Sequence, residues 1–365
     1  MQLRKKIIEW LGLILGGLLL IVVTRYTAPL YQQPLMQVTA SQVLNSTKVV
    51  DEFHNQDRQY TQELTGRILN GSRRGQVVHT RNTYSASGAL DQKYRIGDQV
   101  FISNTRKNIL VKDRKRDTVV VGLLYLAVCL VVMLLHHAGA MALLSVGLNL
   151  VLFFAAIEID LLLHSSGFLW LFSGLALLFA LVTLRLVLGA TKQMLVVFLA
   201  TVSGTGVAMG LSALVLALTS HRGLYFEAMS YVTEVAPQPL FLAATLLGSL
   251  GAVMGQSTDI VASLFALKKD KPTISALELF QAGRQVGRAI MGPLINVLLL
   301  IFIAGTFPIA LLLLRNGNSW GYTFNMTMSL GFAQSLISAI GIVLAVPVAS
   351  FLASRILVQK GGERQ

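Results

Sequence analysis

Polar side chains inside long apolar segments are the residues of this chain that could carry chemistry. Asp259 is the most prominent, and it has small residues and a glutamine on or beside its helical face (Gly248, Ala252, Gly255 and Gln256). A carboxylate inside a bilayer is costly and usually has a partner, water or a functional role. On a face of small residues it can meet another helix closely, bind a cation or exchange a proton.

A structural ion pair is the alternative role for Asp259. The residue lies about two helical turns from the basic end of its segment, where Arg284 or Arg288 could neutralise it. Other polar residues in these segments are amides, which more often form interhelical hydrogen bonds than substrate contacts. The predicted pathway for a small solute or ion comprises Asp259, Gln256, Arg288, Asn296 and Gln334.

Glycines at four-residue spacing recur in the apolar segments, and this spacing lets membrane helices approach closely. The Gly-Thr-Gly triplet that begins at Gly204 resembles part of a nucleotide-binding fingerprint, but it lies within an apolar segment. We therefore predict helix packing for three pairs: Gly206 and Gly210, Gly251 and Gly255, and Gly283 and Gly287.

The sequence lacks enzyme motifs. It has no H-E-x-x-H, no G-x-S-x-G and no pair of cysteine ligands, since Cys129 is the only cysteine. Each of these patterns would signal a metal site or a nucleophile. We therefore predict a protein that is not an enzyme and that holds no metal and no cofactor.

The composition separates the chain from soluble proteins. Hydrophobic residues make up 54% of its 365 residues and charged residues 13%, whereas about a quarter of a soluble chain is charged. The net charge of +13 would suggest nucleic-acid binding in a soluble protein. Here the Lys and Arg residues lie mainly in short connections between apolar segments, so no nucleic-acid partner is predicted.

Eight apolar segments are long enough to cross the ~30 Å hydrocarbon core of a bilayer. The first runs from Ile7 to Thr24 and is predicted to be an uncleaved anchor. A cleaved signal peptide is the alternative, although no small-residue cleavage site precedes Arg25. Seven more segments are predicted at about 118–136, 141–163, 168–188, 194–219, 238–266, 289–314 and 326–354.

The predicted fold is an all-α polytopic membrane bundle of about eight transmembrane helices, with a small extracytoplasmic β-rich domain between the first two spans. Its parts are an anchor helix (1–24), a stalk and β domain (25–117), a seven-helix membrane domain (118–357) and a cytoplasmic tail (358–365). Residues 38–66 have few Gly or Pro and fit either a helix or an extended stalk. Residues 66–111 alternate apolar and turn residues, which predicts short strands in a small barrel or sandwich.

The distribution of basic residues predicts the orientation, because short loops rich in Lys and Arg face the cytoplasm. With eight spans, the loops that hold Arg185, Lys192, Lys268 and Lys269 lie on the same side as the N-terminus. We therefore place the chain in the cell membrane with both termini cytoplasmic and residues 25–117 outside. The basic stretch 106–116 disagrees, but long translocated domains largely escape the charge rule.

The connection over 268–288 contains the signature of a helix start. Ser275 and Glu278 have the S-x-x-E spacing of a capping box, and Ile274 and Leu279 could form the accompanying hydrophobic staple. We predict a short amphipathic helix along the inner membrane surface before the seventh span.

Three runs in the C-terminal third carry a family resemblance. They are LLGSLGAVMGQSTDIVASL, ELFQAGRQVGRAIMGPLINVLLL and SLISAIGIVLAVPVASFLA. Together with the anchor helix, the external domain and about seven further spans, they make the chain resemble the YibE/F-like family of multi-spanning bacterial membrane proteins. Arg288 and Asn296 match the pattern of that family.

Other positions depart from the family pattern. Gly255 stands where an acid usually follows G-x-V-M, and Ala289 stands where an acid follows G-R. In the last span, Gly331 and Gln334 replace charged residues. The resemblance implies that members act in pairs, so either Asp259 or a second YibE/F-like membrane subunit would supply the missing acid.

Two functions follow as hypotheses. The first is a transporter-like subunit that moves a small solute or ion near spans six to eight, where Pro293 and Pro347 permit rearrangement. The second is a non-transporting membrane receptor or assembly protein that works through its external domain, which the lost family charges favour. A membrane enzyme or the permease of an ATP-driven complex has no motif in its support.

Overall fold

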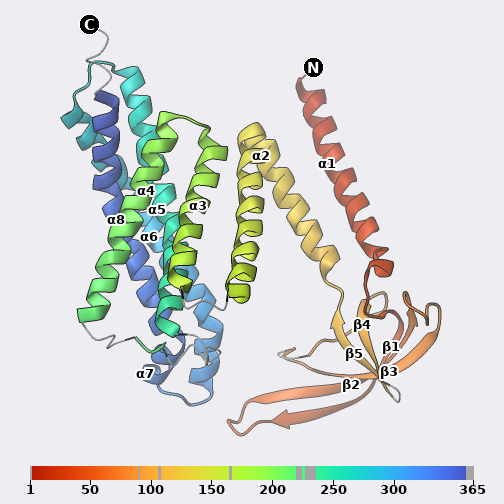
Figure 1. Cartoon of the computed structure of the whole chain (residues 1–365). Coiled ribbons are helices and arrows are strands. Elements are labelled where there is room, and N and C mark those ends of the chain that lie inside the picture. Colours follow the sequence, from red (N-terminus) through yellow and green to blue (C-terminus); the bar gives the residue numbers. More distant parts are fainter. Residues whose placement is uncertain are drawn as a thin grey trace. The chain divides into compact units, whose positions relative to one another are not determined.

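The computed structural model describes residues 2–88, 91–105, 108–163, 167–218, 224–226 and 236–358. The chain divides into two compact units, one up to His136 and the other from His137 onward. The first unit combines helices with an antiparallel sheet, and the described part of the second is helical (Figure 1). Apart from Val358, the predicted tail over 358–365 lies outside the described residues.

A five-stranded antiparallel sheet in the order β3-β2-β1-β4-β5 lies in the first unit and confirms the predicted β-rich region. Its strands are β1 (Leu35–Val50), β2 (Gln56–Ile68), β3 (Val77–Ser85), β4 (Gln99–Thr105) and β5 (Asn108–Arg114). The two end strands approach each other, since the Thr80 hydroxyl on β3 donates to the Ile109 carbonyl on β5. The interior is filled by Met36, Val38, Leu64, Ile68, Tyr94, Val100 and Ile102.

The strands β1 and β2 form a hairpin that extends beyond the rest of the sheet. β4 pairs with β1 only at Leu35–Gln37, and β3 reaches β2 only as far as Gln59. The remaining part, residues 48–58, has two strands and a turn, and we call it the hairpin arm. Residues 38–66 are therefore mostly strand, so the helical alternative is wrong and the extended one is correct. Val and Thr residues along β1 favour this outcome, because β-branched side chains suit strands.

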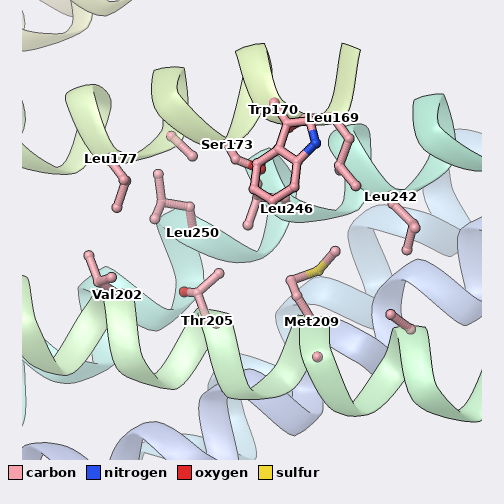
Figure 2. A pocket seen from close by; sticks show the side chains of 14 residues that line it. Leu169, Trp170, Ser173, Leu177, Val202, Thr205, Met209, Leu242, Leu246 and Leu250 are labelled. Carbon is pink, nitrogen blue, oxygen red and sulfur yellow. The ribbon is translucent and has the colours of Figure 1, made fainter. Parts of the chain in front are cut away.

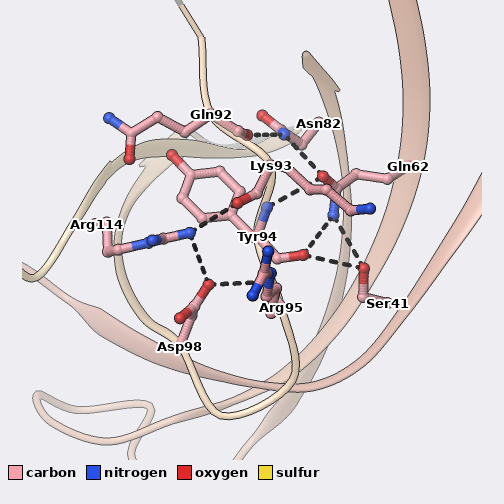
Figure 3. A network of polar contacts seen from close by, with 9 residues as sticks. All are labelled: Ser41, Gln62, Asn82, Gln92, Lys93, Tyr94, Arg95, Asp98 and Arg114. Atoms are coloured by element: carbon pink, nitrogen blue, oxygen red, sulfur yellow. Dashed lines mark hydrogen bonds and ion pairs between the residues drawn. The ribbon is translucent and has the colours of Figure 1, made fainter. Parts of the chain in front are cut away.

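Gln62 joins the sheet to the irregular segment between β3 and β4 (Figure 3). Its buried side chain donates from Nε2 to the Ser41 hydroxyl and the Tyr94 carbonyl. Its Oε1 accepts from the Tyr94 N–H and from Asn82 Nδ2. Both donors and the acceptor of this amide are therefore used, as a buried polar group requires.

A compact polar contact links the sheet to two helices. α1 (Gln2–Arg25) ends before the sheet begins, and α2 (Asp117–Leu163) starts after the sheet ends. The Lys115 ammonium contacts the Thr24 carbonyl near the end of α1 and lies 3.2 Å from the Asp117 carboxylate at the start of α2. Each charge stabilises the helix end that it faces. The Tyr31 hydroxyl also donates to Asp117, and burial, followed by this hydrogen bond, raises the pKa of Tyr31.

The backbone of α2 is interrupted at His136. This helix contains 47 residues and would be about 70 Å long at 1.5 Å per residue, more than twice the hydrocarbon core. His136 has φ 51° and ψ −125°, which lie outside the right-handed helical region. The segments predicted at 118–136 and 141–163 thus belong to α2, on either side of this interruption.

Six long apolar helices occur in the described part of the chain, consistent with a multi-pass membrane protein. They are α2, α3 (Phe168–Leu188), α4 (Lys192–Leu218), α5 (Pro237–Asp270), α6 (Ala276–Arg315) and a continuous stretch of α7 (Trp320–Thr323), a π-helical turn and α8 (Ser329–Val358). This number is below the predicted eight for two reasons. α2 covers two predicted spans, and the described apolar part of α1, Gly12–Arg25, is shorter than the others.

Small residues allow α4, α5 and α8 to pack closely. A Cβ added at Gly204 of α4 would lie 3.3 Å from Val253 on α5 and 3.5 Å from Ala345 on α8. A Cβ added at Gly341 of α8 would lie 2.9 Å from Val253. The lack of a side chain at these two positions therefore helps the three helices to approach closely.

The helix α6 begins at the predicted capping box. The Ser275 hydroxyl accepts from the Glu278 N–H, and the Glu278 carboxylate accepts from the Ser275 N–H. Leu279 is buried, and Ile274 packs against the same cluster. The helix then continues to Arg315, so the prediction of a separate surface helix is wrong. Those residues form the first turns of α6, because no proline interrupts the chain before Pro293.

Candidate functional site

Two residues of the predicted pathway connect helices. The Gln256 side chain on α5 is only 1% exposed, and its Nε2 donates to the Gly287 carbonyl of α6 at 3.3 Å. The Gln334 side chain on α8 donates to the Ala244 carbonyl of α5 at 3.4 Å. α5 is therefore bonded through side-chain amides to α6 and to α8. The Gln256 Oε1 has no hydrogen-bond partner among the described residues.

The other three pathway residues are exposed. Asp259 lies on α5, and Arg288 and Asn296 lie on α6. Within the described part of the chain, the ion pairs are Arg114–Asp98, Lys115–Asp117 and Arg116–Asp113. The predicted alternative of an ion pair between Asp259 and an arginine of α6 is therefore wrong within this chain.

The exposed carboxylate of Asp259 continues an open face of α5. This face consists of the exposed glycines Gly251 and Gly255, whereas Gly248, one turn earlier, lies against the Gln334 side chain of α8. A Cβ added at Gly251 or Gly255 would meet nothing within 4 Å. The open face therefore gives a cation, or a basic group of another chain, room to approach the carboxylate closely.

Of the six glycines predicted at helix contacts, the structure places two at such contacts. A Cβ at Gly283 of α6 would lie 2.5 Å from the Ser350 hydroxyl, and one at Gly287 would overlap Val346, both on α8. Gly206, Gly210, Gly251 and Gly255 have open space where a Cβ would be, contrary to the prediction. The G-x-x-x-G spacing alone does not say which side of a helix its neighbour covers.

Three buried hydroxyls between α4 and α5 were not predicted. Thr201 and Thr205 on α4 and Ser257 on α5 are at most 2% exposed, and their hydroxyls have no partner among the described residues. A helical Ser or Thr can bond back to the carbonyl four residues earlier, as Thr245 does to Phe241. The sequence could show that Thr201 and Thr205 share a face, but not that their hydroxyls leave this bond unmade.

A cavity of about 460 Å³ lies between α3, α4 and α5 (Figure 2). Its walls are largely apolar, and Leu169, Trp170, Met209, Leu242, Leu246 and Leu250 are among the lining residues. Thr205, Gly206 and Gly210 line it from α4. None of the five predicted pathway residues lies in this wall. The described part of the chain contains no group of three His, Cys, Asp or Glu residues placed to hold a metal ion.

Known protein families match both the part of the chain that forms the sheet and the part that forms the helices. Residues 29–113 match the YibE/F family N-terminal domain, and residues 123–359 match the description YibE/F-like protein. No curated protein and no solved structure matches the chain. Since the second match alone covers more than half of the 365 residues, the chain belongs to the YibE/F-like family.

Proposed function

We propose that this protein is a transporter-like membrane subunit that moves a small solute or ion and acts with a second YibE/F-like subunit. The observation that carries the proposal is the unpaired Asp259 carboxylate on the open glycine face of α5. A carboxylate at membrane depth is stabilised by a cation, a basic group or water. The described residues of this chain supply no such ion pair, so a transported cation or the second subunit would provide it.

Contacts of α5 with α6 and α8 support the proposed pathway. Gln256 holds α5 against α6 beside Arg288, and Gln334 holds α5 against α8. The Gln256 Oε1 is buried and has no hydrogen-bond partner among the described residues. Pro293 in α6 and Pro347 in α8 each remove a backbone donor, so these helices have points at which they can bend.

The proposed topology has eight crossings, with both termini cytoplasmic and residues 25–117 outside the cell membrane. The interruption at His136 supports two crossings within α2, and the length of α1 supports a further one. With this count, the basic ends of α3 and α5 face the cytoplasm (Arg185, Lys268 and Lys269).

Flux measurements on the purified complex test the proposal. The tagged chain is isolated from its native host in mild detergent with any membrane protein that accompanies it, and is reconstituted into vesicles. Proton, ²²Na⁺ and ⁸⁶Rb⁺ flux are then measured. We expect Asp259→Asn and Arg288→Ala to reduce the flux at least about tenfold, since each removes a charge from the pathway. Asp270→Asn, which removes an exposed acid at the end of α5, is the matched control and should leave the flux unchanged.

A receptor or assembly role is the second candidate, and the hairpin arm favours it. Val43, Leu44, Val49, Val50 and Phe53 are all exposed on or next to this two-stranded projection. Exposed apolar side chains gathered on one projection are typical of surfaces that contact another protein. Under this candidate, the Asp259 and Arg288 variants would keep their function, whereas changes in the arm would abolish it.

A further inference from the structure

The ends of α1 and α2 next to the sheet lie at the same level. The Lys115 ammonium contacts the Thr24 carbonyl near the end of α1 and lies 3.2 Å from the Asp117 carboxylate at the start of α2. Within one turn of these ends, both helices expose apolar side chains, such as Val23 on α1 and Val119 on α2. With both helices crossing the membrane, this level is the surface of the bilayer.

Three exposed apolar side chains belong to segments that adjoin this level. Tyr26 directly follows α1 and is 75% exposed, and Leu30 ends the short 3₁₀ helix over Ala28–Leu30 and is 80% exposed. Ile96 is 69% exposed and lies in the turn before β4. Water is an unfavourable environment for such side chains, whereas tyrosine is enriched where a membrane meets water. Their position therefore favours contact with lipid.

Backbone hydrogen bonds hold the Ile96 turn next to α1. The Asp98 N–H donates to the Arg95 carbonyl, and the Asp98 carboxylate accepts from the Arg95 N–H. Gly97 has φ 92°, which favours glycine, and its N–H donates to a carbonyl of β1 at 2.8 Å. A Cβ added at Gly97 would lie 3.7 Å from the Arg25 guanidinium at the end of α1. Ile96 therefore lies in a firmly held turn at the level of the helix ends.

Two arginines accompany these apolar side chains. Arg25 and Arg95 are both exposed, and neither belongs to an ion pair in the described part of the chain. The acid of the same turn, Asp98, pairs with Arg114 at 2.9 Å. Guanidinium groups bind phosphate oxygens through paired N–H donors, so both arginines are suited to phospholipid headgroups.

We propose that Arg25, Tyr26, Leu30, Arg95 and Ile96 form an interfacial patch that docks the sheet on the outer surface of the membrane, an inference that rests on the crossing proposed for α1. The three apolar side chains enter the headgroup layer, and the two arginines bond lipid phosphates. The hairpin of β1 and β2 extends away from the ends of α1 and α2 (Figure 1), so the hairpin arm stays in water.

Fluorescence of a probe at position 96 tests the proposal. In a Cys129→Ser background, Ile96→Cys in the full chain is labelled with an NBD maleimide and reconstituted into phosphatidylcholine vesicles, with or without a lipid that carries a nitroxide on its headgroup. We expect blue-shifted emission and strong quenching by the nitroxide lipid. Val49→Cys, at an exposed valine of the hairpin arm, is the matched control and should be neither shifted nor quenched. Val22→Cys, at an exposed position of α1, should be quenched if this helix lies in the lipid.

A second comparison tests the arginines. In vesicles that contain phosphatidylglycerol, Arg25→Gln and Arg95→Gln should each lower the ratio of docked to undocked turn about fivefold, as expected for one basic residue near an anionic surface. The quenching of the probe at position 96 measures this ratio. Arg58→Gln, at an exposed arginine of the hairpin arm, is the matched control and should leave the quenching unchanged.

The outcomes separate the patch from the proposed crossing of α1. Quenching of Val22→Cys without quenching of Ile96→Cys would overturn the patch and leave the crossing intact, whereas loss of quenching at both positions would overturn both. Blue-shifted emission at position 96 that the nitroxide lipid does not quench would also overturn the proposal, because a protein surface would then cover the turn. Unchanged quenching in both arginine variants would overturn the phosphate contacts.

Discussion

Substitution of single glycines in this protein should affect its stability very differently from one position to the next. Gly287 faces the side chain of Val346 on α8, while Gly251 faces open space on α5. Both belong to G-x-x-x-G pairs and both lie in apolar helices, so their sequence context is nearly the same. What distinguishes them is the neighbouring helix, which covers one and not the other.

Gly287→Ala should therefore destabilise the helical unit, because the new methyl group overlaps Val346 and forces α6 and α8 apart. Overpacking of this kind costs about 1–3 kcal/mol, which corresponds to a fall in Tm of several degrees by thermal unfolding in detergent. Gly251→Ala is the control and should leave Tm unchanged or slightly raised, since alanine favours helix. Adding Val346→Ala to Gly287→Ala should recover part of the loss. An unchanged Tm in Gly287→Ala would contradict the close contact.

Among the elements of the first unit, the hairpin arm is the least supported, because no third strand pairs with it. Isolated two-stranded hairpins are marginally stable in water, yet the arm carries several exposed apolar side chains. Its turn is held locally, because the Asp51 carboxylate accepts from the N–H groups of Phe53 and Asn55. The arm is also bonded to the end of β3, since the Ser87 hydroxyl donates to the Asp57 carboxylate and the Ala86 N–H to the Arg58 carbonyl.

Replacing Val50 and Phe53 together with serine separates the two candidate functions. Both side chains are exposed, so thermal unfolding should be unchanged. If the arm docks a partner, the double variant should fail to restore the phenotype of a deletion strain of the native host and should lose its cross-linked partner. Val77→Ser, at an exposed position on β3, is the matched control. Full function in the arm variant, combined with loss in Asp259→Asn, would exclude the receptor hypothesis.

At the scale of the whole molecule, the proposed eight crossings predict which residues a membrane-impermeant maleimide can reach in intact cells. In a Cys129→Ser background, Thr47→Cys, next to the hairpin arm, should be labelled from outside. Thr273→Cys, between α5 and α6, and His137→Cys, next to the interruption in α2, should react only after the cells are permeabilised. A His137→Cys that stays unreactive even then would place the interruption inside the bilayer and would argue against two crossings in α2.

Much of the helical architecture could be predicted from the sequence, because a long apolar segment can be recognised from its own composition. The residues against which it packs need not be known. The capping box at Ser275 was equally local and was predicted for that reason. The hairpin arm was ambiguous, because β1 beyond Val43 is exposed on both faces and so shows no alternation. The cavity could not be predicted, since it arises from space left between three helices that are distant in sequence.

The Lys115 contact has a mechanical consequence. Only two residues separate the end of β5 at Arg114 from the start of α2 at Asp117, and Lys115 also holds the end of α1 through the Thr24 carbonyl. The sheet is therefore joined to α2 by a very short connection, whereas residues 26–34 lie between α1 and β1. A force applied to the sheet would therefore reach the start of α2 through two residues, and the end of α1 through the Lys115 contact.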